Sequence, residues 1–363
     1  MDRQRRLIAH IDMDSFYASA EMVRDGSLRE KPVIIGADPK EGRGRGVVVA
    51  CNYAARKYGV RSAMPISQAW NLCHEAIYLK PDFEYYDLLS DRVMEIIRDR
   101  STKFEQVSID EAFVDLSNSV SSIGDAKLWI IDLKKELMEK TGLTCSVGLA
   151  ESKSAAKIAT DLNKPDGITI VEPDKLREFL APLPIRTIPG VGLKTELLLT
   201  NLGLKTIGDL QRCDQQLLRS HLGKAGVWLW EVANGLELEE VREHTIKSLS
   251  TERTFGEDTS DWNTVEETIR DLSSELVERA TSAHLTFKRV GIKIRFEGFE
   301  THTREMMRKS QVEPDALQRD ALALLKEFMS SKKKVRLIGL KISELSFTSP
   351  NQAEITTWME EKR

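Results

Sequence analysis

The pattern of apolar and polar positions predicts a chain in which strands and helices are mixed. Residues 7–16 and 104–109 form apolar or β-prone runs, and helical spacing is clearest in 85–100 and 126–141. Further strands are expected at 32–35, 46–50 and 143–149, and further helices at 15–23, 53–58, 66–73 and 152–162. Because these elements lack the regular alternation of a doubly wound sheet, we expect an α+β core with an inserted segment.

The second half of the chain contains two predicted linkers. Prolines at 173, 182, 184 and 189 separate the core from a short helical region that ends near Asn234-Gly235. The stretch 237–247 is charged and poor in apolar residues, and it leads into a last α+β unit that ends near Phe347. The order expected in that unit is strand, helix, two strands, helix and strand. A chain of 363 residues is long enough for two to four such domains.

Two acidic clusters follow the strand-like runs, Asp12-Met13-Asp14 and Asp110-Glu111. Side chains alternate between the faces of a strand, so a sheet that pairs both segments places Asp12 beside Asp110. Neighbouring carboxylates repel unless a cation lies between them, and hard oxygen ligands favour Mg²⁺. Two such ions, roughly 3.5–4 Å apart, are the usual machinery for in-line displacement at phosphorus. Asp14 is interpreted either as a further acid of this site or as the cap of the following helix.

The net charge of −4 does not suggest a nucleic-acid partner, but the distribution of charge does. Residues 288–309 contain seven basic and three acidic residues, and residues 330–343 contain five basic residues and no acidic one. The helical stretch 261–278 instead contains six acids and only Arg270 in opposition. This segregation favours a sheet with one face toward phosphates and helices toward water.

Composition excludes several other classes of protein. The chain is 41% hydrophobic and 30% charged, as in ordinary globular proteins, and no run approaches the roughly 18 apolar residues of a membrane span. The apolar stretch after the basic start is too short for a signal peptide. Four scattered cysteines predict neither a disulfide framework nor a zinc site, and they fit a cytoplasmic protein.

An ordered set of motifs resembles the Y-family DNA polymerases, most closely the DinB-like branch. Asp-Met-Asp-Ser-Phe-Tyr-Ala begins at residue 12, Asn-Tyr-Ala-Ala-Arg-Lys-Tyr-Gly-Val at 52, and Ser-Ile-Asp-Glu-Ala-Phe at 108. Ser146–Ala150, Asn163–Gly167 and Ile188–Gly192 follow in the family's order. Each motif alone is weak, but the ordered set spans about residues 7–345 and is very specific.

This resemblance implies a right-hand polymerase with palm, small fingers, helical thumb and C-terminal little finger. The implied domains are palm 1–23 and 80–171, fingers 24–79, thumb 172–238, linker 239–246, little finger 247–348 and tail 349–363. The implied reaction is low-fidelity transfer of a nucleotide from a dNTP to a primer 3′-hydroxyl on primer–template DNA. By resemblance the enzyme is monomeric, bypasses damaged template bases and lacks a proofreading exonuclease.

The resemblance also assigns the catalytic and metal-binding residues. By that assignment Asp12 and Asp110 bridge two Mg²⁺ ions, and the backbone carbonyl of Met13 completes one coordination shell. Glu111 lies beside the ion that activates the 3′-hydroxyl. One ion lowers the pKa of the attacking hydroxyl, and the other neutralises the leaving pyrophosphate.

Four further residues match substrate-binding positions of the family. Tyr53 and Arg56, one helical turn apart, and Lys164 match the positions that bind the triphosphate. Many relatives have a threonine where this chain has Ala50, so one phosphate donor is missing here if that threonine assists binding. Tyr17 matches the residue that selects deoxyribose by excluding a 2′-hydroxyl. As a bare pattern, Phe16-Tyr17 equally fits simple packing.

DNA contacts are expected in two places. Gly190 and Gly192, followed by Lys194, form a helix-hairpin-helix pattern in which backbone amides approach a phosphate. A plain interhelical turn is the alternative. In the little finger, basic residues alternate with apolar ones, which places charge on one face of the sheet. The basic residues expected to contact DNA there are Lys293, Arg295, Lys334 and Arg336.

The tail contains a pattern similar to the peptide that binds sliding clamps. Gln352 is followed by Ile355 and then by Trp358 and Met359. The family motif usually ends in two aromatic residues, and Met359 departs from it. The alternative is a frayed terminal helix without a partner.

Two other function classes also use some of these features. Nucleotide cyclases also set paired acids on an α+β palm, but they do not explain the hairpin motif or the basic C-terminal unit. A non-catalytic DNA-binding scaffold does not require the intact Asp12, Asp110 and Glu111.

Overall fold

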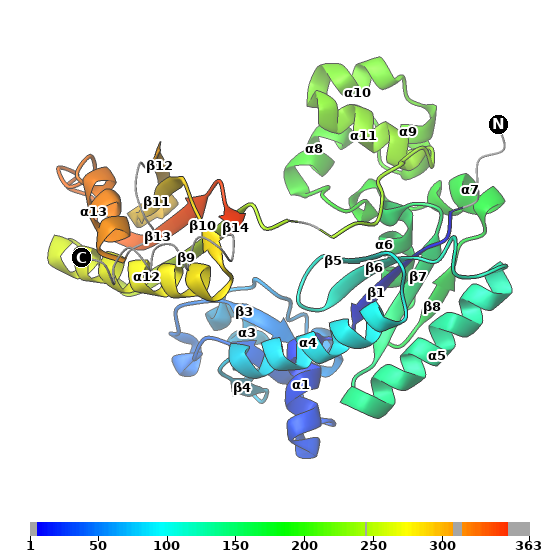
Figure 1. Cartoon of the computed structure of the whole chain (residues 1–363), viewed down its shortest axis with the longest axis horizontal. Coiled ribbons are helices and arrows are strands. Elements are labelled where there is room, and N and C mark those ends of the chain that lie inside the picture. The colour runs from blue at the N-terminus through cyan, green and yellow to red at the C-terminus, as the bar shows by residue number, and fades with distance from the viewer. Residues whose placement is uncertain (1–5, 244, 308–313, 348–363) are drawn as a thin grey trace, which may run out of the picture. The chain divides into compact units, whose positions relative to one another are not determined.

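The computed structural model of the chain describes residues 6–243, 245–307 and 314–347. It forms two compact units, residues 1–244 and 245–363 (Figure 1). Both units combine helices with sheets, as the hydrophobic pattern predicts. Among the described residues, no helix has the length and apolar character needed to cross a membrane.

The core of the first unit is a five-stranded sheet with β1 (Ile8–Met13) at its centre. Strand β1 is buried along its whole length and pairs antiparallel with β6 (Glu111–Asp115) and β7 (Cys145–Ala150). The edges are β5 (Phe104–Gln106) and β8 (Ile168–Ile170). The pairing sets Asp12 opposite Glu111, and Asp110 immediately precedes the strand. The two acidic clusters are therefore adjacent, as the sequence predicts, but the predicted strand 104–109 is wrong. Strand β5 ends at Gln106 and pairs with β6, Asp110 lies in the turn between them, and Glu111 is the residue opposite Asp12.

Helices cover the two faces of this sheet. Side chains at alternate positions of β1 pack with α1 (Phe16–Arg24), α4 (Phe83–Asp99) and α5 (Ile123–Thr141), and the others face α6 (Lys153–Leu162). The helix starts follow local sequence signals, because Asp82, Ser122 and Ser152 each accept a hydrogen bond from a first-turn amide. Helix α6 lies close against β7 at Gly148, where an added Cβ would be 2.1 Å from the Ala156 carbonyl oxygen.

The inserted segment has its own small sheet, in the order β3-β2-β4. Its strands are β2 (Val33–Gly36), β3 (Val48–Cys51) and β4 (Ile77–Leu79), and its helices are α2 (Tyr53–Lys57) and α3 (Ile66–Leu72). Two 3₁₀ turns, η1 (Gly26–Leu28) and η2 (Lys40–Gly42), lie in its loops. Ile34, Val48 and Ile66 belong to a hydrophobic core separate from that of the large sheet.

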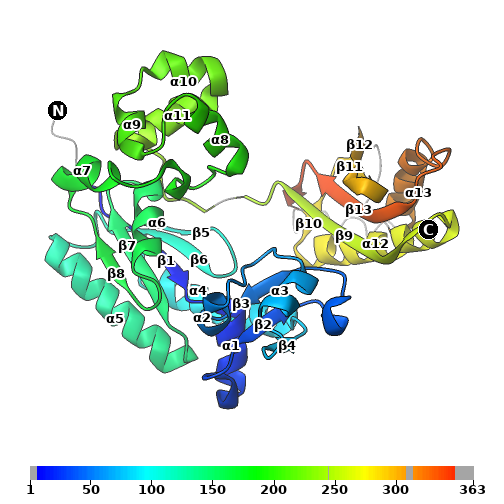
Figure 2. The same cartoon turned by 180° about the vertical axis from the view of Figure 1, so that it is seen from behind.

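The region after the proline cluster is helical, as predicted, and Figure 2 shows its last four helices as one group. Leu199, Leu210, Leu218 and Leu229 are buried between them. The elements are η3 (Pro173–Lys175), α7 (Leu176–Leu180), η4 (Ile185–Thr187), α8 (Leu193–Asn201), α9 (Ile207–Arg212), α10 (Gln215–Leu222) and α11 (Lys224–Ala233).

The charged stretch predicted as a linker starts as a segment bound to the core. Glu237 is buried and accepts hydrogen bonds from the Ser154 amide (2.9 Å) and hydroxyl (2.8 Å) at the start of α6. Lys153 bridges Glu105 (2.7 Å) and Glu239 (2.8 Å). The charges that suggested a solvated linker therefore serve as partners for the helix N-terminus and for a buried lysine.

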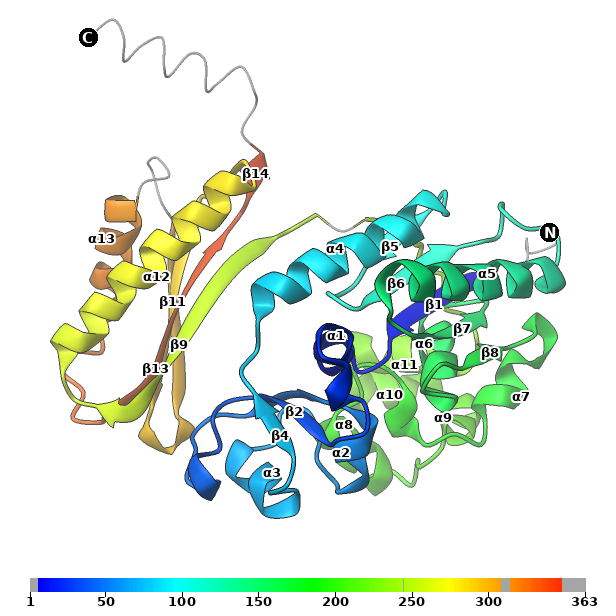
Figure 3. The same ribbon diagram turned by 90° about the horizontal axis from the view of Figure 1, so that it is seen from below.

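The second unit is a four-stranded sheet in the order β12-β11-β13-β9, covered on one face by α12 and α13 (Figure 3). Its element order matches the predicted one, with two short strands added that are below the length a hydrophobic pattern can indicate. The elements are β9 (Ser248–Thr259), α12 (Trp262–Ser282), β10 (Leu285–Thr286), β11 (Arg289–Phe296), η5 (Glu297–Phe299), β12 (Thr301–Met307), α13 (Pro314–Leu325), β13 (Val335–Ser343) and β14 (Ser346–Phe347).

Candidate active site

A polar cavity of about 230 Å³ lies beside the end of β1. Seven of the eight residues predicted for metal and substrate binding line it, together with Ala50 and Ser15. The exception is Glu111, which pairs with Asp12 across the strands. Those seven residues are Asp12, Met13, Tyr17, Tyr53, Arg56, Asp110 and Lys164. The structure thus brings together acids from the sheet and hydroxyl and cationic groups from α2 and from the loop after α6.

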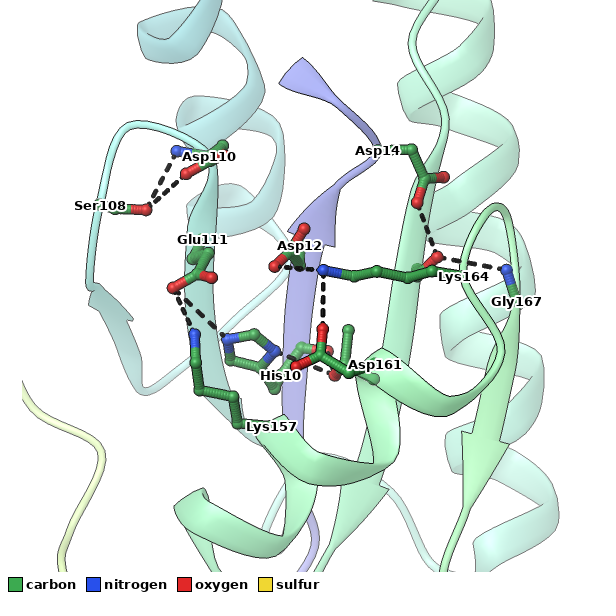
Figure 4. A network of polar contacts seen from close by, with 12 residues as sticks. His10, Asp12, Asp14, Ser108, Asp110, Glu111, Lys157, Asp161, Lys164 and Gly167 are labelled. Carbon is green, nitrogen blue, oxygen red and sulfur yellow. Dashed lines mark hydrogen bonds and ion pairs between the residues drawn. The ribbon is translucent and has the colours of Figure 1, made fainter. Parts of the chain in front are cut away.

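Each carboxylate in this cluster has a different neighbour (Figure 4). Asp12 is buried, and its Oδ2 lies 2.7 Å from the Lys164 ammonium. Asp110 accepts a hydrogen bond from the Ser108 hydroxyl at 2.6 Å. Glu111 Oε2 lies 2.6 Å from the ammonium of Lys157. Two lysines therefore compensate part of the negative charge of the three acids.

Lys157 is a residue that the sequence argument missed. It lies on α6, one helical turn before Thr160, and both side chains face the central strands, since Lys157 contacts Glu111 and Thr160 contacts His10. Helical spacing alone could not indicate this, because it required knowing that α6 packs beside β1. Lys164 itself also contacts Asp161 at 2.9 Å.

The directions of the pKa shifts indicate that Lys157 and Lys164 do not fully compensate the charge of the three acids. Burial raises the pKa of Asp12 to about 8, although Lys164 opposes the rise. Burial also raises the pKa of Asp110, assisted by the charge of Glu111. Burial acts in the same direction on Glu111, but its hydrogen bonds with Asp12 and Lys157 lower its pKa overall. The site therefore favours a further cation near Asp12 and Asp110.

His10 lies directly behind the acids and was not singled out by the sequence. It is fully buried, and burial lowers its pKa to about 3, so the ring is neutral. Its Nδ1 lies 2.9 Å from the Thr160 hydroxyl, and its Nε2 has no hydrogen-bond partner and lies 4.0 Å from Glu111 Oε2. A neutral imidazole thus lies behind the Glu111 carboxylate.

Asp14 does not cap helix α1, so that interpretation is wrong. The cap position is Ser15, whose side chain makes no capping hydrogen bond. Asp14 Oδ1 instead accepts a hydrogen bond from the Ser146 hydroxyl (2.8 Å), and Oδ2 accepts one from the Asp166 amide (2.8 Å). The Asp14 carboxylate connects the end of β1 to the turn that follows Lys164, because its oxygens are bonded to β7 and to that turn.

A second contact holds the same turn from the other side. The Lys134 ammonium on α5 lies 2.7 Å from Asp166 Oδ1 and is itself largely buried. Asp14 and Lys134 together fix the turn 164–167, and through it the starting point of the Lys164 side chain.

Tyr53 and Arg56 lie together on α2, as their spacing predicts. The Arg56 guanidinium is 4.7 Å from the centre of the Tyr53 ring, and the Tyr53 hydroxyl is 3.4 Å from Asp14 Oδ1. Asn52 fixes the start of this short helix by accepting a hydrogen bond from the Ala55 amide. The helix thereby holds both side chains at the cavity.

Tyr17 packs against other aromatic rings and also borders the cavity. Its ring packs 4.6 Å from the ring of Tyr86 and 6.0 Å from that of Phe83, centre to centre. It is only half-buried and lines the cavity beside Asp110. The ring is thus held from behind and forms part of the cavity wall.

The helix-hairpin-helix segment presents an open backbone. Gly190 has a φ of 85°, which favours glycine, and Gly192 precedes α8. A Cβ added at either glycine would meet nothing within 4 Å, and Lys194 is exposed. No side chain therefore obstructs the approach to the backbone at either glycine.

The open face of the second sheet is less positive than the strand composition predicts. Lys293 is bound by Glu252 of β9 at 2.8 Å, and Arg295 donates to the Thr301 hydroxyl at 2.8 Å. Arg336 lies 3.7 Å from Asp258, whereas Lys334 is exposed. Acids from a strand distant in the sequence neutralise part of the basic face.

The residues of the clamp-peptide prediction, Gln352, Ile355, Trp358 and Met359, lie outside the residues that the structure describes.

Replacing Asp14 with asparagine should destabilise the protein. One Asp14 oxygen would become an amide group facing a donor, which should lower the free energy of unfolding by about 1–3 kcal/mol. Denaturant titration measures the loss. The matched control is Asp161→Asn, an exposed carboxylate in the same network that should cost less than about 0.5 kcal/mol. Equal stability of Asp14→Asn and wild type would contradict the anchoring role.

Comparison with known proteins identifies the family. Residues 11–161 match the impB/mucB/samB family, residues 246–355 its C-terminal domain, and residues 186–237 the DNA polymerase-iota thumb domain. DNA polymerase IV of Methanoculleus marisnigri is 44% identical over 352 residues, covering 96% of this chain and 97% of that protein.

Solved structures of similar fold belong to the same class of polymerases. A Y-family DNA polymerase chimera of Dbh and Dpo4 has a TM-score of 0.88 at 27% identity, covering 94% of this chain and all of that one. An insertion ternary complex of Dbh DNA polymerase has a TM-score of 0.69 at 26% identity, with the same coverage. The predicted multidomain polymerase fold is therefore confirmed, and the nucleotide-cyclase alternative is not supported. The chain belongs to the impB/mucB/samB family of Y-family, DinB-type DNA polymerases.

Proposed function

We propose that this chain is a DNA-directed DNA polymerase that performs low-fidelity translesion synthesis. It adds nucleotides from dNTPs to a primer 3′-hydroxyl on template DNA. The observation that supports this most directly is the single cavity in which Asp12 and Asp110 face Tyr53, Arg56 and Lys164. Acids are required on the side of the primer terminus, and cationic and hydroxyl groups on the side of the triphosphate.

The acids of the cavity fit a pair of Mg²⁺ ions held by Asp12, Asp110, Glu111 and the Met13 carbonyl. The donors are hard oxygens, and burial raises the pKa of Asp12, so a bound cation would stabilise its ionised form. Within the described ranges, no three His, Cys, Asp or Glu side chains are already gathered as an ion site. When bound, Mg²⁺ activates the attacking hydroxyl and neutralises the leaving pyrophosphate.

The triphosphate is bound in this proposal by Lys164, Arg56 and Tyr53. Arg56 can form paired hydrogen bonds to phosphate oxygens, and the Lys164 ammonium acts as a point charge. Lys164 contacts Asp12 in the nucleotide-free protein. It exchanges this carboxylate for a phosphate oxygen when the substrate enters, while its turn stays fixed by Asp14 and Lys134.

DNA is held at two surfaces without a sequence code. Backbone amides near Gly190 and Gly192, with Lys194, contact one phosphate region. In the second unit, Lys293, Arg295, Lys334 and Arg336 contact the duplex backbone. Because these contacts are electrostatic, affinity should fall steeply with salt. We expect a monomer that acts in the cytoplasm, where its four free cysteines remain reduced.

Asp110→Ala should abolish nucleotide addition while primer–template binding stays nearly intact. Asp110 serves the ions, whereas most of the DNA affinity comes from basic contacts to phosphates. Primer extension and equilibrium DNA binding measure the two properties. Asp91→Ala, which removes an exposed carboxylate on α4, is the matched control and should extend primers normally. A parallel loss of binding and extension in Asp110→Ala would indicate misfolding instead.

Mg²⁺ affinity should increase with pH below about pH 8. With a metal-free pKa of about 8, Asp12 binds a proton at lower pH that the cation must displace, so affinity rises by up to about tenfold per pH unit. Above that pH the rise should level off. Calorimetric titration with MgCl₂ between pH 6 and 9 tests this. Asp12→Asn should lose both the affinity and its pH dependence, and a flat profile in the wild type would refute the assignment.

Tyr17→Ala should admit ribonucleotides while deoxynucleotide addition continues. The ring that would contact a 2′-hydroxyl is removed, so the preference for dCTP over CTP opposite guanine should fall by about tenfold or more. Ratios of kcat/KM for the two nucleotides provide the measurement. Tyr17→Phe retains the ring and should keep the preference. An unchanged ratio in Tyr17→Ala would leave Tyr17 as a packing residue.

Deleting residues 350–363 should spare distributive synthesis but remove stimulation by a sliding clamp. Ile355, Trp358 and Met359 suit one helical turn docking into an apolar groove, in which the aromatic residue dominates the affinity. Trp358→Ala should therefore reproduce most of the effect, and Thr357→Ala should not. The assay is primer extension on a long circular template, with and without the cognate clamp and loader. Equal stimulation of the full-length and shortened proteins would exclude the clamp peptide.

A further inference from the structure

Ser15 has an unfavourable backbone conformation at the edge of the active-site cavity. Its φ of 48° and ψ of 44° lie in the left-handed region, which a serine rarely adopts. The Ser19 amide donates to the Ser15 carbonyl at 2.9 Å, and the Ser19 hydroxyl donates to the Asp14 carbonyl at 2.5 Å. These two contacts join the loop to the first turn of α1. Such residues occur preferentially at functional sites.

The Ser15 hydroxyl is buried without a partner. The residue is 8% exposed, and its Oγ has no hydrogen-bond partner of acceptable geometry. A buried hydroxyl that makes no hydrogen bond lowers the stability of the fold, and such groups often have a role in binding. Ser15 and Tyr53 line the same cavity. Burial and the charge of Asp14 raise the pKa of the Tyr53 phenol, and a contact with the Ser15 hydroxyl acts against that rise. The Ser15 hydroxyl is therefore directed toward Tyr53, but the pair does not have the geometry of a hydrogen bond.

The surroundings of this hydroxyl suit an anion. Ser15 is the cap residue of α1, a helix of nine residues whose first-turn amides receive no side-chain cap. Unsatisfied amides and the helix dipole attract negative charge at this end. Arg56 and Lys164 line the cavity as well, whereas Ala50, also at its wall, offers no polar side chain.

We propose that the Ser15 hydroxyl is a triphosphate-binding group that donates a hydrogen bond to a phosphate oxygen of the incoming dNTP. It supplies in this chain a donor that Ala50 cannot provide. The assignment rests on the proposed polymerase function and adds a residue to its substrate site. A hydrogen bond to a charged phosphate is stronger than one between neutral groups, so its loss should be measurable.

The test is the equilibrium dissociation constant of a dNTP for the enzyme bound to primer–template. The primer ends in a dideoxynucleotide, so no bond can form and binding alone is measured. Ser15→Ala should weaken binding by about tenfold, the effect of losing one hydrogen bond to a charged group. The loss should be the same for all four dNTPs, each opposite its complementary base. A loss confined to one base would overturn the phosphate assignment.

Ser15→Gly distinguishes the effect of the hydroxyl from the effect of the backbone conformation. Glycine adopts a φ of 48° freely, so this variant keeps the loop conformation while removing the hydroxyl. If the hydroxyl binds phosphate, Ser15→Gly should weaken dNTP binding as much as Ser15→Ala does. Wild-type affinity in Ser15→Gly would instead show that Ser15 matters only for the shape of the loop, and would overturn the proposal.

A second substitution tests whether Ser15 replaces the hydrogen-bond donor that is absent at Ala50. Ala50→Thr restores a hydroxyl at the cavity wall and should recover most of the affinity lost in Ser15→Ala, while it adds little to the wild type. Absence of any recovery would overturn the claim that Ser15 replaces a donor missing at Ala50. Failure of the wild-type protein to extend a primer would refute the proposed function, whereas unchanged dNTP affinity of Ser15→Ala in an active polymerase would refute only the role of Ser15.

Discussion

The antiparallel pairing of β1 with β6 and β7 is the constraint on which the arrangement of the site depends. It sets Asp12 opposite both Glu111 and Ser146, and it joins the Met13 amide to the Asp110 carbonyl at 2.9 Å. A slip of one residue would turn the acids to the opposite face of the sheet, among the apolar residues that pack on α1, α4 and α5. The apolar alternation of β1 that builds the core therefore also determines where the acids lie.

The end of β1 organises the substrate side of the cavity as well. Asp14 receives hydrogen bonds from Ser146 and from the Asp166 amide, so the turn that holds Lys164 is attached to the same strand as Asp12. Immediately afterwards the chain bends at Ser15 and starts α1, which brings Tyr17 to the cavity wall. Groups for both halves of the reaction are positioned by six consecutive residues, 12–17, because a buried strand ends where a helix begins.

Sequence patterns predicted contacts that follow from local periodicity and motifs, and missed those that depend on packing between distant segments. The proximity of the two acidic clusters was predicted from strand pairing, and the joint projection of Tyr53 and Arg56 from helical spacing. The residue opposite Asp12 is Glu111 and not Asp110, because the chain turns before Asp110 and the pairing strand starts at Glu111. The partners of Asp14 are 132 and 152 residues away, so capping was an equally sound prediction. Likewise, Glu252 neutralises Lys293 from 41 residues away across a register that composition does not reveal.

The two lysines beside the acids differ in what they allow the site to do. Lys157 is on α6 and holds Glu111, whose lowered pKa keeps its carboxylate ionised. Lys164 lies on a turn after that helix and contacts both Asp12 and the more exposed Asp161. Loss of the Asp12 contact therefore leaves Lys164 paired and costs less than isolating an ammonium would. In the proposed reaction, Lys164 can transfer its charge from Asp12 to a phosphate while Lys157 keeps Glu111 in place, which couples substrate entry to the release of Asp12.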